Sequence, residues 1–409
     1  VFILACLFIA TPLLAAEFLI GRQARRSPPE AAGVVARQSG LSPAWNLIGV
    51  LGTVGSFIII SYYTVIAGWV MAYTWRCASG ALSGLRHAEV VSLWRAFLAD
   101  PWRMGAWHAA FIALVAVISA RGVHRGLELA NKLRAPVMLL LMLVLAGYAL
   151  GHGDARGGLR FAFAPHLAAI TPAVILAAIG QAFYATGVGM AMMLAYGAYV
   201  QRGTSLLRSA IIISLGILLV SMLATLIIFP LVFRYGMDPA QGADLVFDVL
   251  ASVFAEMPAG RLFGTLFFLL LVFAALTPSL AGIEPLVAWL QQRRGGSRAM
   301  AVTVSAVCVW LAGIASVLSF NRWSQFHPLE FLPGFAGRTV FDSLDYLASN
   351  LLLPLGATLT SVFVGWRLQA SMRADQFSET TPAARRLLVW LLRYVCPLAI
   401  IAVLIANLR

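Results

Sequence analysis

The stretch Gly180-Gln181-Ala182-Phe183-Tyr184-Ala185-Thr186-Gly187-Val188-Gly189-Met190 decides how this sequence folds. It places glycines, polar side chains and two aromatic rings in the middle of an otherwise apolar run. Inside a membrane, irregular backbone is tolerated only where it is buried in protein or lines a cavity. A helix broken near Gly187 and Gly189 would expose amides that bind a substrate carboxylate and carbonyls that bind a cation. Close helix packing through small residues is the alternative interpretation, and the stretch alone leaves both open.

The composition indicates a membrane protein. Of the 409 residues, 61% are hydrophobic and only 11% are charged, whereas soluble domains carry about 25% charged residues. The 29 Lys and Arg residues lie in short blocks between apolar runs, which is typical of membrane loops. The net charge of +13 therefore does not indicate a nucleic-acid partner. No nucleophile with its base, metal cluster or phosphate loop occurs among the runs, so we expect no enzyme.

Ten apolar runs approach or exceed the roughly 20 residues needed to cross a bilayer. Basic residues are concentrated in alternate loops, and the positive-inside rule predicts that these loops are cytoplasmic. This orientation places residue 1 outside the cell at the start of an apolar run, so we expect an eleventh span to precede it. The ten runs lie near 1–20, 45–75, 105–120, 134–151, 168–200, 206–233, 260–291, 300–319, 341–367 and 387–408.

Two further runs carry hydroxyl groups. Ser61-Tyr62-Tyr63 interrupts the second run, and a tyrosine hydroxyl in hydrocarbon needs a partner. In the seventh run, Thr277 precedes Pro278, where a helix must release a backbone carbonyl, so the pair offers ligands for a hard cation. Interfacial tyrosines, and a threonine bonded to its own helix, are the alternatives.

Three acids lie within or at the edges of the runs: Glu17, Glu284 and Asp345. Such acids are functional candidates because a charge is costly inside a membrane. For Glu17 and Glu284 an anchor or a structural pair is as plausible as a role in gating, and Asp345 could be a surface acid.

These motifs follow one another in the order found in a known family. They resemble the second, third, sixth, eighth and eleventh transmembrane segments of the neurotransmitter:sodium symporter family, whose first segment has no counterpart here. The resemblance covers nearly the whole chain. The matching segments are Thr11-Pro12-Leu13-Leu14-Ala15-Ala16-Glu17-Phe18-Leu19-Ile20-Gly21-Arg22, Tyr62-Tyr63 with Trp69, Gly180-Gln181-Ala182-Phe183-Tyr184, Ala274-Ala275-Leu276-Thr277 with Glu284-Pro285, and Arg393-Tyr394 with Pro397.

The resemblance implies an all-α integral membrane protein with the leucine-transporter fold, in which two inverted five-helix repeats surround a central substrate site. Residues 1–409 would form a single transporter domain. Within it, 1–151 would be the remainder of the first repeat, 168–367 the second repeat and 387–408 the final span. We expect a multi-pass protein of the bacterial inner (plasma) membrane.

The resemblance also implies roles for single residues. Tyr63 would meet the substrate carboxylate, and Tyr184 would close over the substrate from outside. Gln181 and Asp345 would complete the outer gate with Tyr184. The pocket around the substrate side chain would be lined by Ile59, Thr186, Gly187, Met190, Pro278, Ser279 and Gly282.

Sodium is the coupling ion that the resemblance implies. Its ligands would include the carbonyl of Ala274 and the hydroxyl of Thr277. Ala185 stands where the family often places a hydroxyl ligand for another sodium, and Pro278 stands where it places a serine. We therefore expect one sodium per substrate rather than two.

The leading hypothesis is a sodium-coupled symporter that moves an amino acid or related zwitterion by alternating access. Gly187 and Gly282 remove atoms from the pocket wall and Met190 can repack, so large apolar side chains should be favoured. The alternatives are a proton-coupled transporter in which Glu17 or Glu284 titrates, and a non-transporting relative. The expected partners are the substrate and the lipid bilayer, and the oligomeric state is left open.

Overall fold

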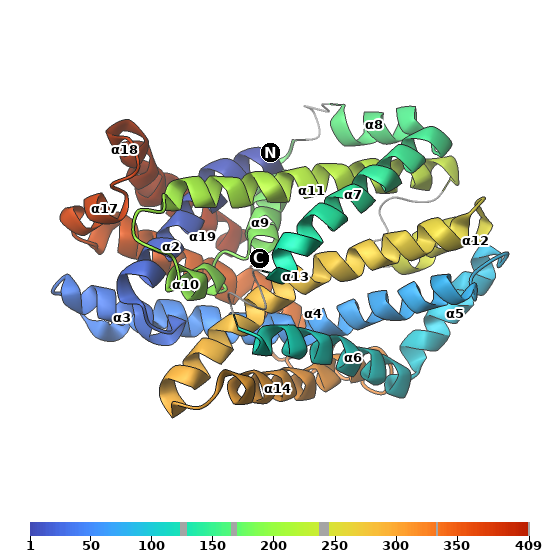
Figure 1. Cartoon of the computed structure of the whole chain (residues 1–409), viewed down its shortest axis with the longest axis horizontal. Helices are drawn as coiled ribbons and strands as arrows, with labels where there is room; N and C mark the ends of the chain where they lie inside the picture. The colour runs from blue at the N-terminus through green and yellow to red at the C-terminus, as the bar shows by residue number, and fades with distance from the viewer. Residues whose placement is uncertain (123–128, 165–169, 237–244, 333, 408–409) are drawn as a thin grey trace.

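The structure is a computed structural model that describes residues 1–122, 129–164, 170–236, 245–332 and 334–407 (Figure 1). Within these ranges every regular element is a helix, which confirms the all-α expectation. Residues 168 and 408, where two predicted spans begin and end, lie outside the described residues. In the described part, nine helices are long and apolar enough to cross a membrane, namely Phe2–Ala24, Pro43–Ser79, Pro101–Ala120, Ala135–His152, Leu206–Arg234, Gly260–Arg294, Arg298–Ser319, Val340–Arg367 and Pro382–Asn407.

Capping side chains set where several helices begin. Asp100 precedes α6 (Pro101–Ala120), and its Oδ1 accepts a hydrogen bond from the amide of Trp102 at 3.0 Å. Such a cap satisfies an amide that the first turn of a helix leaves unpaired. The same role falls to Thr171 before α9 (Pro172–Thr186), Ser205 before α11 (Leu206–Arg234) and Ser297 before α14 (Arg298–Ser319).

Two long helices, α4 (Leu47–Ser79) and α13 (Gly260–Arg294), lie side by side through the centre of the molecule (Figure 1). Helices α6, α14 and α16 (Leu353–Val362) pack against α4. Small residues permit this close packing. A Cβ at Gly68 of α4, for example, would lie only 2.8 Å from the backbone nitrogen of His108 of α6.

The connecting segments gather at two ends of the molecule. Helices α3 (Pro28–Gln38), α17 (Ala370–Gln376) and α18 (Pro382–Trp390) lie at one end, and α5 (His87–Ala99), α8 (Ala155–Phe163) and α12 (Ala251–Glu256) at the other (Figure 1). We call the first the arginine-rich end, because it carries Arg25, Arg26, Arg293, Arg294, Arg298, Arg373, Arg385 and Arg386. The positive-inside rule predicts that this end is cytoplasmic.

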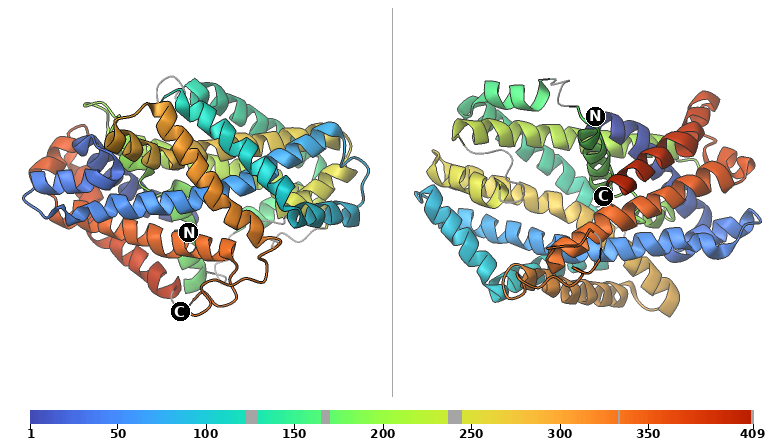
Figure 2. Two further views of the ribbon diagram at one scale, coloured as in Figure 1. Left: turned by 90° about the horizontal axis from the view of Figure 1, so that it is seen from below. Right: turned by 180° about the vertical axis from the view of Figure 1, so that it is seen from behind.

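The predicted span 168–200 is interrupted. Helix α9 ends at Thr186, and α10 (Met192–Gly197) begins only after a non-helical turn over 187–191. The structure thus confirms the broken helix, which was one of the two interpretations of this stretch. Helix α9 packs against α1 (Phe2–Ala5) and α19 (Cys396–Asn407), near both ends of the described chain (Figure 2).

The remaining described helices are α2 (Thr11–Ala24), α7 (Leu129–His152) and α15 (Val340–Tyr346). Wider, π-helical turns occur within several spans, at Cys6–Ala10, Leu347–Leu352, Phe363–Arg367 and Leu391–Val395. Another, at Leu245–Leu250, leads into α12. A single 3₁₀ turn, Pro43–Asn46, leads into α4.

Candidate functional site

Left-handed backbone keeps the break between α9 and α10 open. Gly187 has φ +66°, Gly189 has φ +85° and Ala191 has φ +55°. A side chain at Gly189 would also collide with the carbonyl oxygen of Leu353 on α16. Only glycine satisfies both conditions, because it lacks a Cβ and adopts positive φ without strain. Packing on α16 therefore requires glycine at this position.

Glu17 of α2 supports the break from another side. Its side chain is fully buried, and its Oε1 accepts a hydrogen bond from the amide of Gly189 at 2.7 Å. The second oxygen, Oε2, is buried and has no hydrogen-bond partner among the described residues. A hydrogen bond to a carboxylate contributes about 1.5–3 kcal/mol. Glu17 thus provides a hydrogen-bond acceptor for the amide of Gly189, which lies in the non-helical turn.

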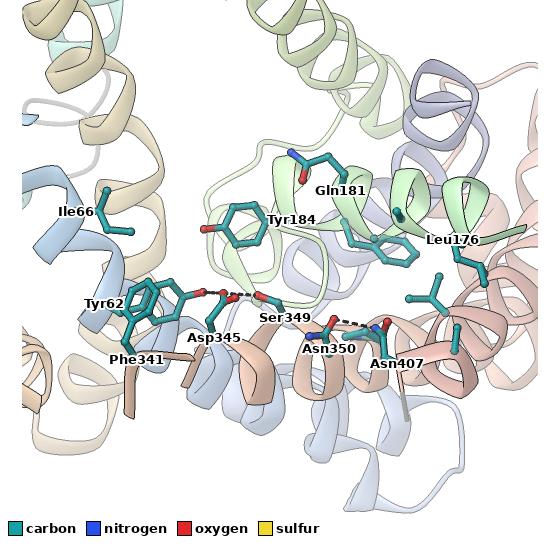
Figure 3. Close-up of a pocket in the computed structure, with 17 residues that line it drawn as sticks. Tyr62, Ile66, Leu176, Gln181, Tyr184, Phe341, Asp345, Ser349, Asn350 and Asn407 are labelled. Carbon is teal, nitrogen blue, oxygen red and sulfur yellow. Dashed lines mark hydrogen bonds between the residues drawn. The ribbon is translucent and has the colours of Figure 1, made fainter. Parts of the chain in front are cut away.

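A cavity of about 810 Å³ opens beside α9, between that helix, α4, the span Val340–Arg367 and α19 (Figure 3). The three residues assigned to the outer gate, Gln181, Tyr184 and Asp345, all line it. Two hydroxyls hold the carboxylate of Asp345. Tyr62 donates to Oδ1 at 2.7 Å and Ser349 donates to the same atom at 3.1 Å. The three predicted gate residues therefore share one cavity, while Tyr62 and Ser349 hold the Asp345 carboxylate.

The cavity is lined by Tyr62, whereas Tyr63 is half-buried and packs against both hydrophobic cores of the molecule. Adjacent residues of a helix point about 100° apart, so the two tyrosines face different surroundings. The contact of Tyr63 with a substrate carboxylate stays a prediction. Sequence reasoning did not single out Asn350 and Asn407, which also line the cavity and are joined by a 2.8 Å hydrogen bond.

Thr186 and Met190 lie at the break, and Ile59 belongs to the same hydrophobic core as Met190. Ile59 and Met190 are buried in the same hydrophobic core, with 4% and 3% of their surface exposed. The hydroxyl of Thr186 donates to the carbonyl of Ala182 at 2.7 Å. That hydroxyl is thus bonded within its own helix, and Thr186 presents chiefly its methyl group to other neighbours.

The two pocket glycines flank Met192, a residue that the sequence did not single out. A Cβ at Gly187 would lie 3.1 Å from the Met192 sulfur, and one at Gly282 would lie 3.2 Å from its terminal methyl group. A Cβ at Gly282 would also collide with the side chain of Ile60. The expectation that Gly282 leaves open volume is therefore wrong, because Ile60 and Met192 fill it. The Gly282 carbonyl accepts a hydrogen bond from Ser56 of α4 at 2.7 Å.

Helix α13 offers two oxygens of the kind that hard cations prefer. Pro278 has no amide hydrogen, so the carbonyl of Ala274, four residues earlier, lacks its usual helical partner. Ala274 is half-buried and Thr277 is exposed. Ser279 differs, since it is buried and its hydroxyl donates to the carbonyl of Ala275 at 2.8 Å. The donor set of Ala274 and Thr277 fits sodium in chemical kind and would supply part of a coordination shell; that these oxygens bind sodium stays a prediction.

Glu284 forms a buried ion pair at the arginine-rich end. Arg298 of α14 contacts its two carboxylate oxygens at 2.6 and 3.0 Å. Tyr199, which follows α10, donates to Oε1 at 3.2 Å, and Arg298 also donates to the carbonyl of Ser119 of α6 at 2.9 Å. The structure thus makes Glu284 the centre of a network that joins α13, α14, α6 and the end of the broken span.

Comparison with known proteins agrees with this geometry. Residues 101–409 match the model of the Sodium:neurotransmitter symporter family. The chain is 34% identical to the uncharacterized sodium-dependent transporter YhdH of Bacillus subtilis, over 98% of this chain and 88% of the relative. It is 28% identical to an uncharacterized sodium-dependent transporter of Haemophilus influenzae, over 100% of this chain and 89% of the relative.

Among solved structures, the chain is similar to MhsT in complex with L-phenylalanine. The TM-score is 0.89 and the identity 33%, over 99% of this chain and 91% of that one. This similarity confirms the leucine-transporter fold. The similar proteins are transporters rather than enzymes, and with the apolar helices they establish a multi-pass membrane protein. The chain belongs to the sodium:neurotransmitter symporter family.

Proposed function

We propose that this protein is a sodium-coupled symporter that carries an amino acid or related zwitterion by alternating access. The observation that carries the proposal is the break at 187–191, which is packed against α16 and bonded to Glu17. Broken helices of this kind supply amides for an anionic substrate group and carbonyls for a cation. Membership of a family of sodium symporters supports sodium as the coupling ion.

The residues around the cavity support the proposed outer gate. Tyr184 lines the cavity and precedes Gly187 by less than one helical turn, so a small movement of α9 would carry its ring over a substrate at the break. Gln181 and Asp345 would close the same side. Tyr63 would donate a hydrogen bond to the substrate carboxylate from the other side of the Tyr184 ring.

Large apolar substrates fit the proposed pocket best. Met190 and Met192 lie beside Gly187, and unbranched methionine side chains repack around different shapes. Ile59 and Pro278 would make the remaining wall apolar, so a charged substrate side chain would be excluded by its desolvation cost. Phenylalanine bound to the similar MhsT is in keeping with this preference.

The test is uptake into proteoliposomes with sodium and proton gradients imposed separately. We expect accumulation driven by sodium, and stronger competition by leucine, phenylalanine and tryptophan than by glycine, glutamate or lysine. Uptake that does not depend on sodium would contradict the proposed sodium coupling. A preference for glycine, glutamate or lysine would contradict the proposed preference for large apolar substrates.

Proton coupling is the second candidate, and one observation favours it: the Oε2 of Glu17 is buried and makes no hydrogen bond within the described part of the chain. Glu284 is a weaker candidate because protonation would break its ion pair with Arg298. Glu17→Gln distinguishes sodium coupling from proton coupling. The oxygen of the glutamine side chain can still accept a hydrogen bond from the amide of Gly189, but the side chain does not titrate. Sodium-driven uptake should survive this change, whereas proton-driven uptake would be lost.

A further inference from the structure

A second pocket, of about 560 Å³, is lined by residues of α17, α18 and the turn Leu391–Val395. Helices α17 and α18 lie at the arginine-rich end (Figure 1). Four arginines line it, Arg373, Arg385, Arg386 and Arg393, and no acidic residue does. The pocket is far along the chain from the break, and it shares no lining residue with the cavity beside α9.

The positive charge in this pocket is not balanced by a carboxylate of the described residues. None of the four arginines forms an ion pair within the described ranges. Arg373 is buried, and it donates to the carbonyls of Val364 and Gly365 at 2.9 Å each. Arg393 donates to the carbonyl of Gly365 at 2.7 Å. Burial and the neighbouring charge of Arg393 lower the pKa of Arg373. Two fixed charges thus form the floor of the pocket.

Aromatic side chains place the pocket at the level of phospholipid headgroups. Trp366, Trp390 and Tyr394 are exposed, and their rings contact one another with centroids 5.5 and 6.2 Å apart. Exposed tryptophan and tyrosine are typical of the membrane–water interface. Further along the same span, α19 exposes Leu398 and Ile405. A lipid with its headgroup in the pocket could lay its acyl chains against this apolar surface.

We propose that this pocket binds the phosphate headgroup of an anionic phospholipid of the cytoplasmic leaflet. Arg385 and Arg386 at the mouth would meet the phosphate, while Arg373 and Arg393 neutralise it from the floor. Arginine forks bind phosphate oxygens in pairs, and basic pockets between helices on the cytoplasmic side bind such headgroups. Free phosphate shares this chemistry, but it makes no contact with the apolar surface of α19.

Lipid binding would act on the span that carries the gate. Arg373 and Arg393 bind the last turn of Val340–Arg367 through Gly365, and Asp345 lies in the same span. A bound headgroup removes the repulsion between these two arginines, so the folded protein should be stabilised by anionic lipid.

The test is native mass spectrometry of the full chain, titrated with dioleoylphosphatidylglycerol or dioleoylphosphatidylcholine. The variant R385A/R386A removes the two charges at the mouth. R25A/R26A is the matched control, because it removes two exposed charges at the same end outside the pocket. We expect the wild type to retain more dioleoylphosphatidylglycerol than dioleoylphosphatidylcholine. R385A/R386A should bind dioleoylphosphatidylglycerol about 10- to 30-fold more weakly than the wild type. The control R25A/R26A should bind this lipid with the wild-type affinity.

Three outcomes would overturn the proposal: equal retention of the two lipids, equal losses in the two variants, or retention unchanged in R385A/R386A. Inorganic phosphate is added as a competitor in a further arm. If it displaces the lipid at equal concentration, the site binds free anions and the lipid assignment is wrong. Thermal unfolding without lipid verifies that both variants are folded, and added phosphatidylglycerol should raise the melting temperature of the control but not of R385A/R386A.

Discussion

Tyr62 and Tyr63 are adjacent in α4 but face different surroundings, so their loss should have different effects. Tyr63→Phe removes the hydroxyl proposed to meet the substrate carboxylate. One charge-assisted hydrogen bond is worth about 1.5–3 kcal/mol, so the affinity should fall roughly 10- to 150-fold. Tyr62→Phe removes the hydroxyl that donates to Asp345, and should slow uptake while changing affinity little. Calorimetric binding and uptake measure the two effects, and unchanged affinity in Tyr63→Phe would remove Tyr63 from the site.

Single residues also show what sequence reasoning could reach at this scale. Asp345, Gln181 and Tyr184 were identified from the resemblance, and they share one cavity in the structure. Met192 was missed because nothing in its local sequence distinguishes it from an ordinary core methionine. Its position between Gly187 and Gly282 depends on how α13 approaches the break. Such an approach is a tertiary property, which spacing along one chain does not encode.

At the scale of the element, the break itself is the feature to test. Gly189→Ala would place a methyl group against Leu353 and force a left-handed alanine, which costs about 1–2 kcal/mol before the collision is counted. We expect transport to be lost. Gly216→Ala is the matched control, because that glycine lies in α11 with open space around its missing Cβ. Uptake and thermal unfolding of both variants decide the matter, and normal uptake by Gly189→Ala would show that the break is dispensable.

The second element to test is the ion pair that joins α13 to α14. Arg298→Ala leaves the fully buried Glu284 without its counter-ion, which typically destabilises a protein by about 3–5 kcal/mol. The double variant Glu284→Gln/Arg298→Met removes both charges and should recover most of that loss. The free energies of unfolding of the single and double variants provide the measurement. Equal losses in the two would mean that the pair does not hold these helices together.

The path of the backbone was predictable at this scale, and the contacts between helices were not. Apolar runs of about 20 residues specify spans whatever they pack against, so their approximate positions were recovered. The partner of Glu284 was left open because Arg298 lies beyond a turn, and only the angle between α13 and α14 brings the two groups together. The same limit applies to Glu17, whose partner Gly189 is 172 residues away.

For the whole molecule, coupling requires that sodium bind one conformation more tightly than the other, because a ligand shifts an equilibrium only by its differential affinity. Helix α13 is suited to such a role. It packs against α4 through Gly282 and Ser56, and it carries the oxygens of Ala274 and Thr277. A cation held between α13 and a moving helix would therefore favour one arrangement of the bundle.

Thr277→Val tests this coupling, since it replaces the hydroxyl with a methyl group of nearly the same size. We expect the sodium concentration for half-maximal uptake to rise about tenfold or more, in proportion to one lost oxygen ligand. Thr265→Val on the same helix is the control, because that hydroxyl bonds within its own helix to the carbonyl of Arg261 at 2.6 Å. Ala185 offers no side-chain oxygen for a second ion, so the Hill coefficient for sodium should lie near one in the wild type. A coefficient near two, or a Thr277→Val protein with unaltered sodium dependence, would place the coupling site elsewhere in the molecule.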